Sequence, residues 1–190
     1  MDIKTLIKSR RTIRHFEQKP LTKEQLTSYI DAARLAPAAA NVQPLKYVVV
    51  QSADMAKKVF PNVKWAGYLK GEYNPNPGEE PVAYIAVCED KSIKQAGNDM
   101  DIGAAVENII LAALSDGVGA CWMAAIDREE ISKLLKLSEN LYLSCVVALG
   151  YPKESPKEVA VTDDDIKYYV DGETLCVPKR AMDEVLIDII

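Results

Sequence analysis

"MDIGAAVENIILAALSDG", residues 100–117, carries apolar residues on almost every side of the helix that it predicts. We expect a long helix from about Ile93 to Ser115, with only Glu107 and Asn108 interrupting its apolar middle. A helix that is apolar all round has to be buried all round. A chain of 190 residues can enclose one such helix, but a two-fold partner would cover it more easily. The stretch therefore predicts a homodimer interface along this helix, and a central helix in a monomer is the alternative.

Short, strongly apolar runs before and after this helix predict β-strands. The runs are nearly continuous rather than alternating, which is typical of strands that are covered on both faces. The expected strands are 46–50, 82–88, 119–124 and 141–149, and the other expected helices are 2–9, 22–35, 52–60 and 128–137. Thr22 and Gln25 form a capping-box pattern at the start of one helix, and Pro37 ends it. The mixed order of elements predicts an α+β, or layered α/β, fold.

The composition predicts one globular domain and argues against several functions. With 190 residues, 48% apolar and 27% charged, the chain can form a sizeable core, and we expect residues 1–190 to be a single domain. A net charge of −5 argues against a dedicated nucleic-acid binder. No apolar run approaches the roughly 18 residues that span a bilayer, and the first residues lack the pattern of a signal peptide. We expect a cytoplasmic protein that binds neither nucleic acid nor membrane.

Cysteine and histidine are too few and too scattered for common metal or nucleophile chemistry. The four cysteines form no C-x-x-C pair, so we expect reduced core residues rather than disulfides or metal ligands. His15 is the only histidine, which argues against zinc hydrolases and Ser-His-Asp hydrolases. We expect no metal site, and any chemistry should be that of a bound cofactor.

The segment "KSRRTIRHF", residues 8–16, is basic within an acidic protein. Its cationic and hydroxyl side chains are Lys8, Arg10, Arg11, Thr12 and Arg14. Guanidinium groups donate paired, charge-assisted hydrogen bonds to phosphate. The segment therefore predicts a specific anion site, with a solvated basic face as the alternative. Arg180 could supply a second cation to the same anion, although on its own it would be interpreted as an ordinary surface arginine.

The connection "RLAPAAANVQP", residues 34–44, is small, uncharged and stiff, whereas ordinary surface loops are richer in Gly, Ser and Asp. Such a loop would allow a flat bound group to lie against it. The composition changes again at Tyr151, where residues 151–190 begin as an irregular, proline-bearing segment. A hairpin is expected around Asp171 and Gly172. The apolar end of the chain should dock on another surface, with a second subunit as one candidate.

Taken together, five stretches in order along the chain resemble the FMN-dependent nitroreductase superfamily. They are "SRRTIRHF" (9–16), "AARLAPAAANVQPLKYVVV" (32–50), "DIGAAVENIILAALSDGVGACWM" (101–123), "VALGYPKE" (147–154) and "PKRAMDEV" (178–185). The segment 65–85 is also similar to a clade of small members whose reactions are mostly unassigned. The resemblance implies a central mixed sheet covered by helices on both faces, in an intertwined homodimer. FMN would bind at the interface, and the 151–190 segment would pack on the partner subunit.

The resemblance also assigns expected roles to individual residues. Arg10, Arg11 and Thr12 would bind the phosphate and ribityl end of FMN, and Arg180 would close on the phosphate. Arg14 would lie near flavin N1 and O2, where a fixed cation stabilises the charge left by reduction. The loop residues expected to lie along the isoalloxazine ring from the other subunit are Pro37, Ala38, Ala39, Asn41 and Gln43. The backbone segment expected to border the flavin is Met123, Ala124 and Ala125.

Some residues differ from the usual pattern of the superfamily. Ala38 stands where Ser is usual, which removes a hydroxyl that can reach the flavin, and Leu45 stands where Trp is common. A substrate lid is expected within residues 64–80. There Trp65 and Tyr68 could stack on a flat substrate, or they could belong to the core.

The function expected from the resemblance is a ping-pong, FMN-dependent NAD(P)H oxidoreductase that acts on a nitroaromatic, a quinone or a similar small acceptor. No protein acid or base is assigned. The alternatives are a flavin-binding sensor without turnover, a binder of another phosphate ligand, and a superfamily variant such as a dehalogenase or dehydrogenase.

Overall fold

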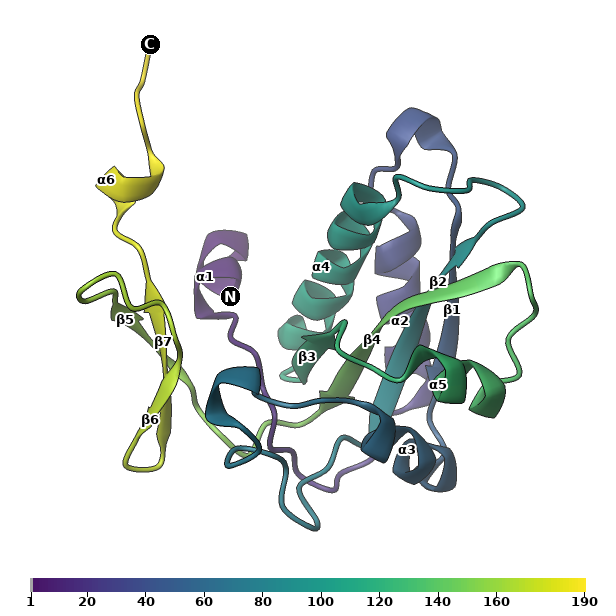
Figure 1. Ribbon diagram of the computed structural model, residues 1–190, viewed down its shortest axis with the longest axis horizontal. Helices are drawn as coiled ribbons and strands as arrows, with labels where there is room; N and C mark the ends of the chain where they lie inside the picture. The colour runs from purple at the N-terminus through teal and green to yellow at the C-terminus, as the bar shows by residue number, and fades with distance from the viewer. Residues whose placement is uncertain (1) are drawn as a thin grey trace.

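The computed structural model describes residues 2–190, which form a layered arrangement of helices and strands (Figure 1). The helices are α1 (Ile3–Ser9), α2 (Lys23–Arg34), α3 (Ala53–Val59), α4 (Asp99–Ser115), α5 (Arg128–Leu134) and α6 (Met182–Val185). Short 3₁₀ turns lie at Ala39–Asn41, Phe60–Asn62 and Gly67–Leu69. The strands are β1 (Leu45–Val50), β2 (Ala83–Asp90), β3 (Gly119–Met123), β4 (Leu141–Gly150), β5 (Lys157–Ala160), β6 (Tyr169–Asp171) and β7 (Thr174–Lys179).

The central sheet has the strand order β1-β2-β4-β3, which confirms the expected strands. Neighbouring strands are antiparallel, with Tyr47 opposite Val87 between β1 and β2. A parallel bridge between Thr12 and Ala120 extends the sheet beyond β3 and gives it a mixed character. Every residue of β2 is buried, as its continuous apolar pattern predicts.

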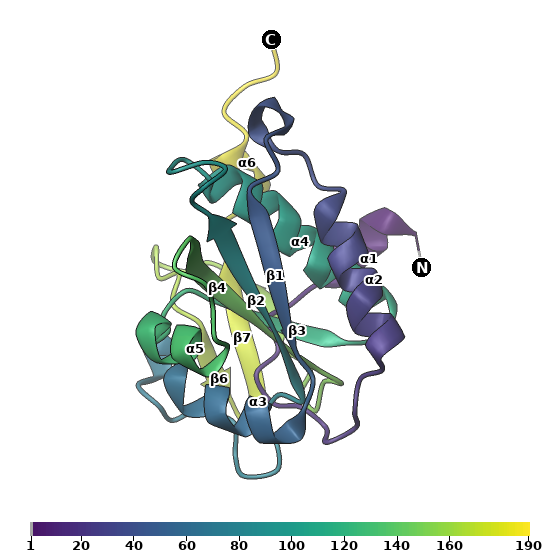
Figure 2. The same cartoon turned by 90° about the vertical axis from the view of Figure 1, so that its right-hand side faces the viewer.

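Helices cover both faces of this sheet, as expected. Alternate side chains of β2 point to opposite faces. Ile85 and Val87 are buried with residues of α2 and α4, whereas Tyr84 and Ala86 are buried with residues of α3 and α5. Figure 2 shows the α2–α4 pair and the α3–α5 pair on different sides of the strands.

Helix α4 starts later than the sequence predicts, at Asp99 rather than near Ile93. The expectation was wrong for residues 93–98 because turns intervene between β2 and α4. The N–H of Ile93 donates to Asp90 O over 3.0 Å, and Gly97 has a φ of 75°, a left-handed conformation that ends regular structure. Ile93 remains exposed as a result.

The apolar surface of α4 is only partly covered by this chain. Ile102, Val106 and Ile109 are buried in the core with α2 and the sheet. On another side, Met100 is 81% exposed and Leu111 is half-buried. The helix is therefore apolar all round, as predicted, but one side of it lies open.

Residues 151–190 form an arm that stands beside the layered body (Figure 1). Its sheet has the order β5-β7-β6, and the expected hairpin turns at Gly172, which has a φ of 61°. The chain ends in an extended apolar tail, in which Ile187 is 98% exposed and Ile189 is 83% exposed. None of the helices found between residues 2 and 190 has the length and apolar character required to cross a membrane.

Candidate cofactor site

Within the basic segment 8–16, Thr12 and Ile13 lie along the outer edge of β3. Thr12 bridges Ala120 in parallel, and the N–H of Ile13 donates to Ala120 O over 2.9 Å. Gly119 makes this close approach possible, because a Cβ at that position would lie 2.7 Å from Ile13 Cγ1. The strand edge therefore fixes the backbone that carries the predicted arginines.

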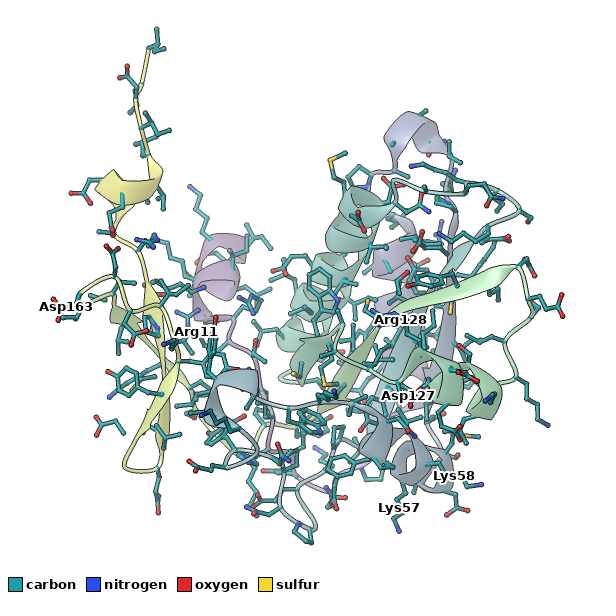
Figure 3. The ribbon with its side chains drawn as sticks, viewed as in Figure 1. Arg11, Lys57, Lys58, Asp127, Arg128 and Asp163 are labelled. Atoms are coloured by element: carbon teal, nitrogen blue, oxygen red, sulfur yellow. The ribbon has the colours of Figure 1, made fainter. Side chains whose placement is uncertain are left out.

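Arg10 and Arg11 lie next to each other on the wall of a cavity of about 260 Å³. Arg10 Nε is 3.5 Å from Glu107 Oε1 of α4. Arg11 pairs with Glu158 of the arm, and Figure 3 shows it between the basic segment and the arm. Both carboxylates are substantially exposed, and such pairs contribute only about 0–1 kcal/mol. The two guanidinium groups can therefore exchange these partners for a phosphate.

Arg14 differs from its neighbours because it is buried, with only 9% of the residue exposed. Its Nε lacks a hydrogen-bond partner among residues 2–190. Its guanidinium carbon lies 5.0 Å from the centre of the Tyr168 ring, a cation–π contact with the arm. A buried cation with an unpaired donor is costly unless a ligand satisfies it. Arg14 is therefore suited to hold negative charge on a bound group.

Glu154 fixes the backbone that carries Arg14, a role that no local sequence pattern predicts. Its carboxylate accepts hydrogen bonds from the backbone N–H groups of Arg14 and His15. The Tyr73 hydroxyl also donates to it, over 2.5 Å. Burial and this hydrogen bond raise the pKa of Tyr73 above its ordinary value, so the phenol stays protonated. Its position in the matched stretch "VALGYPKE" was the available signal.

The predicted isoalloxazine loop has an unusual backbone. Ala40, Asn41 and Gln43 have φ values of 51°, 54° and 52°, which place three non-glycine residues in the left-handed region. Such conformations are unfavourable and concentrate at ligand sites. The loop borders a separate cavity of about 180 Å³, whose walls include Pro37, Ala38 and Gln43.

This loop and the arginine segment do not meet in one chain. On α4, the loop cavity is lined by Asp101 and Ala105, whereas the arginine cavity is lined by Ile110 and Leu114. The two cavities share no lining residue, and at 1.5 Å of rise per residue the nearest of these positions, Ala105 and Ile110, are about 7.5 Å apart along the helix. One chain therefore presents two separate half-sites, and the prediction that two subunits combine them is not tested by this chain alone.

The third predicted group lies at the end of β3, the strand that the arginine segment follows. Met123 is buried, whereas Ala124 and Ala125 are exposed. Ala125 O accepts a hydrogen bond from the N–H of Lys64, and Ala124 O accepts one from the Arg128 guanidinium, each over 2.9 Å. This backbone therefore follows directly from the strand whose edge the basic segment contacts at Ala120.

Arg180 lies on the arm, where its guanidinium is 3.0 Å from Asp164 and 3.3 Å from Glu184. Arg180 thus pairs with acidic residues of the arm rather than with an anion shared with the basic segment. All three side chains are exposed, so the pairs are weak and can exchange.

The two aromatic residues of the expected lid differ in their surroundings. Trp65 is 7% exposed and its ring lies 5.8 Å from that of Phe60. In this structure Trp65 therefore belongs to the core, which was the alternative to a role in substrate stacking. Tyr68 is 52% exposed and its ring lies 4.9 Å from that of Tyr168. Of the two, Tyr68 is the one that a substrate could reach.

The cysteines are reduced and buried, as expected. Burial raises the pKa of Cys88 to about 12 and the pKa values of Cys121 and Cys145 to about 11, so these thiols stay protonated at neutral pH. The described residues contain no cluster of three potential metal ligands. A cavity of about 730 Å³ beside α3 includes none of the predicted site residues.

Comparison with known proteins identifies a family and a shared fold. The model of the nitroreductase family matches residues 7–151. A protein of Archaeoglobus fulgidus, provisionally named NADH dehydrogenase/NAD(P)H nitroreductase, is 36% identical over 166 residues, or 84% of this chain and 90% of that protein. A relative with the same provisional name from Methanothermobacter thermautotrophicus is 32% identical, over 87% of this chain and 85% of that protein.

Among solved structures, a provisionally named nitroreductase from Desulfovibrio desulfuricans in complex with FMN matches with a TM-score of 0.73 at 20% identity. The match covers 100% of this chain and 98% of that one. The layered fold described above is shared with that structure.

Proposed function

Because the chain belongs to the nitroreductase family, we propose that it is an FMN-dependent NAD(P)H oxidoreductase. It would work by a ping-pong cycle with a nitroaromatic, a quinone or a similar small molecule as acceptor. FMN, when bound, would supply the two-electron chemistry between NAD(P)H and this acceptor. The provisional names of the relatives support the nicotinamide donor, and the FMN complex of the Desulfovibrio protein supports the cofactor.

The observation that carries this proposal is the state of Arg14. Its guanidinium is buried, and Nε has no hydrogen-bond partner within the part of the chain that the structure describes. A reduced flavin carries negative charge on its N1–C2=O edge, and a fixed cation there stabilises that charge. Arg14 supplies such a cation, and Glu154 holds its backbone in place.

The phosphate end of FMN would be held by the half-site around Arg10 and Arg11. These two guanidinium groups and the Thr12 hydroxyl provide the donors that a phosphate and a ribityl chain need. Arg180 would add a further cation after leaving its exposed partners on the arm. These guanidinium and hydroxyl donors therefore match the negative charge of the FMN phosphate.

A homodimer would complete the site by bringing the 37–43 loop of one subunit to the arginine half-site of the other. The uncovered side of α4 and the apolar tail support this assembly, because both leave apolar surface in water. The 151–190 arm would then pack on the second subunit as part of a single domain covering 1–190. The small side chains of Ala38 and Ala39 would let the loop backbone approach a flat ring.

Within this proposal the protein contributes charge and orientation, and no acid or base is assigned. Met123, Ala124 and Ala125 would border the flavin through their backbone. Tyr68, which is exposed on the 64–80 segment, is the aromatic residue proposed to stack on the acceptor.

The substitution Arg14→Gln tests the proposal, with Lys58→Gln as a matched control. Lys58 is exposed on α3, so its substitution removes one positive charge far from the proposed site. We expect Arg14→Gln to lower the flavin reduction potential and to slow anaerobic reduction by NAD(P)H about tenfold or more. Both quantities are measured on the FMN-loaded proteins. If Arg14→Gln matched the wild type and the control in both, the role proposed for Arg14 would be wrong.

A further inference from the structure

Asp101 is a buried carboxylate that the reaction proposed above does not use. It lies in the first turn of α4 and is only 4% exposed. Its Oδ1 accepts a hydrogen bond from the backbone N–H of Ala39 over 3.0 Å. Its Oδ2 is also buried, with Lys94 Nζ at 3.6 Å. The contact with Ala39 links α4 directly to the proposed isoalloxazine loop.

The 38–43 turn needs such an external contact because its other hydrogen bonds within the described residues are local, and the next bond to the body of the protein lies beyond it, from Asp90 N–H to Pro44 O over 2.8 Å. The N–H groups of Asn41 and Val42 donate back to Ala38 O and Ala39 O, which closes the turn on itself. These bonds shape the turn but do not attach it to the body of the protein. Left-handed conformations at Ala40, Asn41 and Gln43 are unfavourable in isolation, so the surrounding structure has to hold them.

The start of α4 provides a firm base for this contact. Asn98, the N-cap residue, donates from its side chain to Glu89 of β2 over 2.5 Å. Lys94, whose ammonium lies next to Asp101, also donates to Gly97 O over 2.9 Å. Asp101 is thus carried by a turn that is bonded to the central sheet, and such support is what positions a site residue accurately.

An interaction with the helix dipole does not account for the burial of Asp101. Acidic side chains in the first turn stabilise a helix, and Asp99 supplies this interaction while it remains exposed. Asp101 is buried instead, and it uses one oxygen for the backbone of the loop. The geometry therefore indicates a role toward the loop.

We propose that Asp101 is a positioning residue, which holds the 38–43 turn in the conformation that meets the isoalloxazine ring. This inference rests on the proposed function, because it takes the loop to be an FMN-binding element. Without the carboxylate oxygen, the turn loses its bond to α4, and part of the binding free energy of FMN has to be spent on ordering it.

The test compares Asp101→Ala with Asp101→Asn and Asp99→Ala. Asp101→Ala removes the acceptor, Asp101→Asn keeps an oxygen acceptor at the same reach, and Asp99→Ala removes an acidic side chain from the same helical turn. FMN affinity is measured by fluorescence titration of the apoprotein, and the visible circular dichroism of bound flavin reports its surroundings. We expect Asp101→Ala to weaken FMN binding about tenfold or more and to alter the dichroism. Asp101→Asn should restore both, and Asp99→Ala should match the wild type.

A second variant removes the donor instead of the acceptor. Ala39→Pro has no N–H at residue 39, and Ala38 already has the extended conformation, φ −128° and ψ 143°, that a following proline requires. It tests the same contact even if Asp101→Ala fails to fold. We expect a similar loss of FMN affinity, and little further loss when Ala39→Pro is combined with Asp101→Asn.

The outcomes separate this inference from the function on which it rests. A wild-type protein that takes up no FMN overturns the proposed function, and the inference with it. If the wild type binds FMN and the Asp101→Ala and Ala39→Pro variants bind it equally well, with unchanged dichroism, only the role of Asp101 is overturned.

Discussion

Gly119→Ala tests how the fold positions the basic segment. The added Cβ would lie 2.7 Å from Ile13 Cγ1, 2.8 Å from Ile13 Cβ and 3.0 Å from Ile13 Cγ2. A rotamer change could move the two γ carbons, but Ile13 Cβ is fixed to the backbone. The segment would therefore have to shift away from β3, against the hydrogen bond from Ile13 N–H to Ala120 O.

The expected cost follows from this overlap. Forcing extra methyl groups into packed sites typically costs about 1–3 kcal/mol, and we expect the free energy of unfolding to fall by that amount. Because the displaced segment carries Arg10 and Arg14, FMN binding should also weaken. In an Ile13→Ala background the γ carbons are gone and only the Cβ overlap remains, so Gly119→Ala should cost less there.

Urea unfolding of the four proteins in this double-mutant cycle measures the coupling, and FMN titration measures the effect on the site. Gly67→Ala is the matched control, since a Cβ there meets no atom of the described chain within 4 Å. Equal unfolding free energies for Gly119→Ala and the wild type, or equal costs in both Ile13 backgrounds, would show that this close approach does not limit the segment.

Three further predictions concern pH, thiols and assembly. Although burial favours its neutral form, hydrogen bonds from Lys91, Ser144 and Asn98 hold the pKa of Glu89 below its ordinary 4.5. The resulting stability is complete above that value and is lost as pH falls through the lower folded pKa, so urea titrations across acidic pH should show a steeper loss for the wild type than for Glu89→Gln. Cys88, Cys121 and Cys145 should react with a thiol reagent at neutral pH only after unfolding, and a fast reaction of these three thiols in the native protein would contradict their raised pKa values. Leu111→Glu on the open side of α4 should shift the mass measured by light scattering from dimer to monomer; an unchanged dimer would place the interface elsewhere.

Most of the fold could be predicted because its signals are local. The continuous apolar run of β2 indicates burial on both faces, and the Thr22–Gln25 capping box is present with both of its hydrogen bonds. The start of α4 could not be predicted in the same way, because Ile93 fits a helical pattern although turns precede the helix. Those turns depend on Gly97 and on contacts with β2.

The same distinction between local signals and long-range contacts applies to the candidate site. Arg14 could be singled out from a local cluster of charge, but its anchor Glu154 lies 140 residues away in the chain. Asp101 and Ala39 are 62 residues apart, and no local pattern links them. Trp65 shows the reverse difficulty, because an aromatic residue in a loop looks available until tertiary packing buries it. Roles that arise from long-range contacts require the structure.

The most direct test of the proposed function is the visible absorption spectrum of the freshly purified protein, repeated without oxygen after NAD(P)H is added. We expect flavin bands that bleach directly to the two-electron-reduced form, since Arg14 provides a buried cation for the charge of reduction. A colourless protein that also fails to take up added FMN would contradict the cofactor assignment. Flavin bands that persist with both NADH and NADPH would contradict the proposed oxidoreductase.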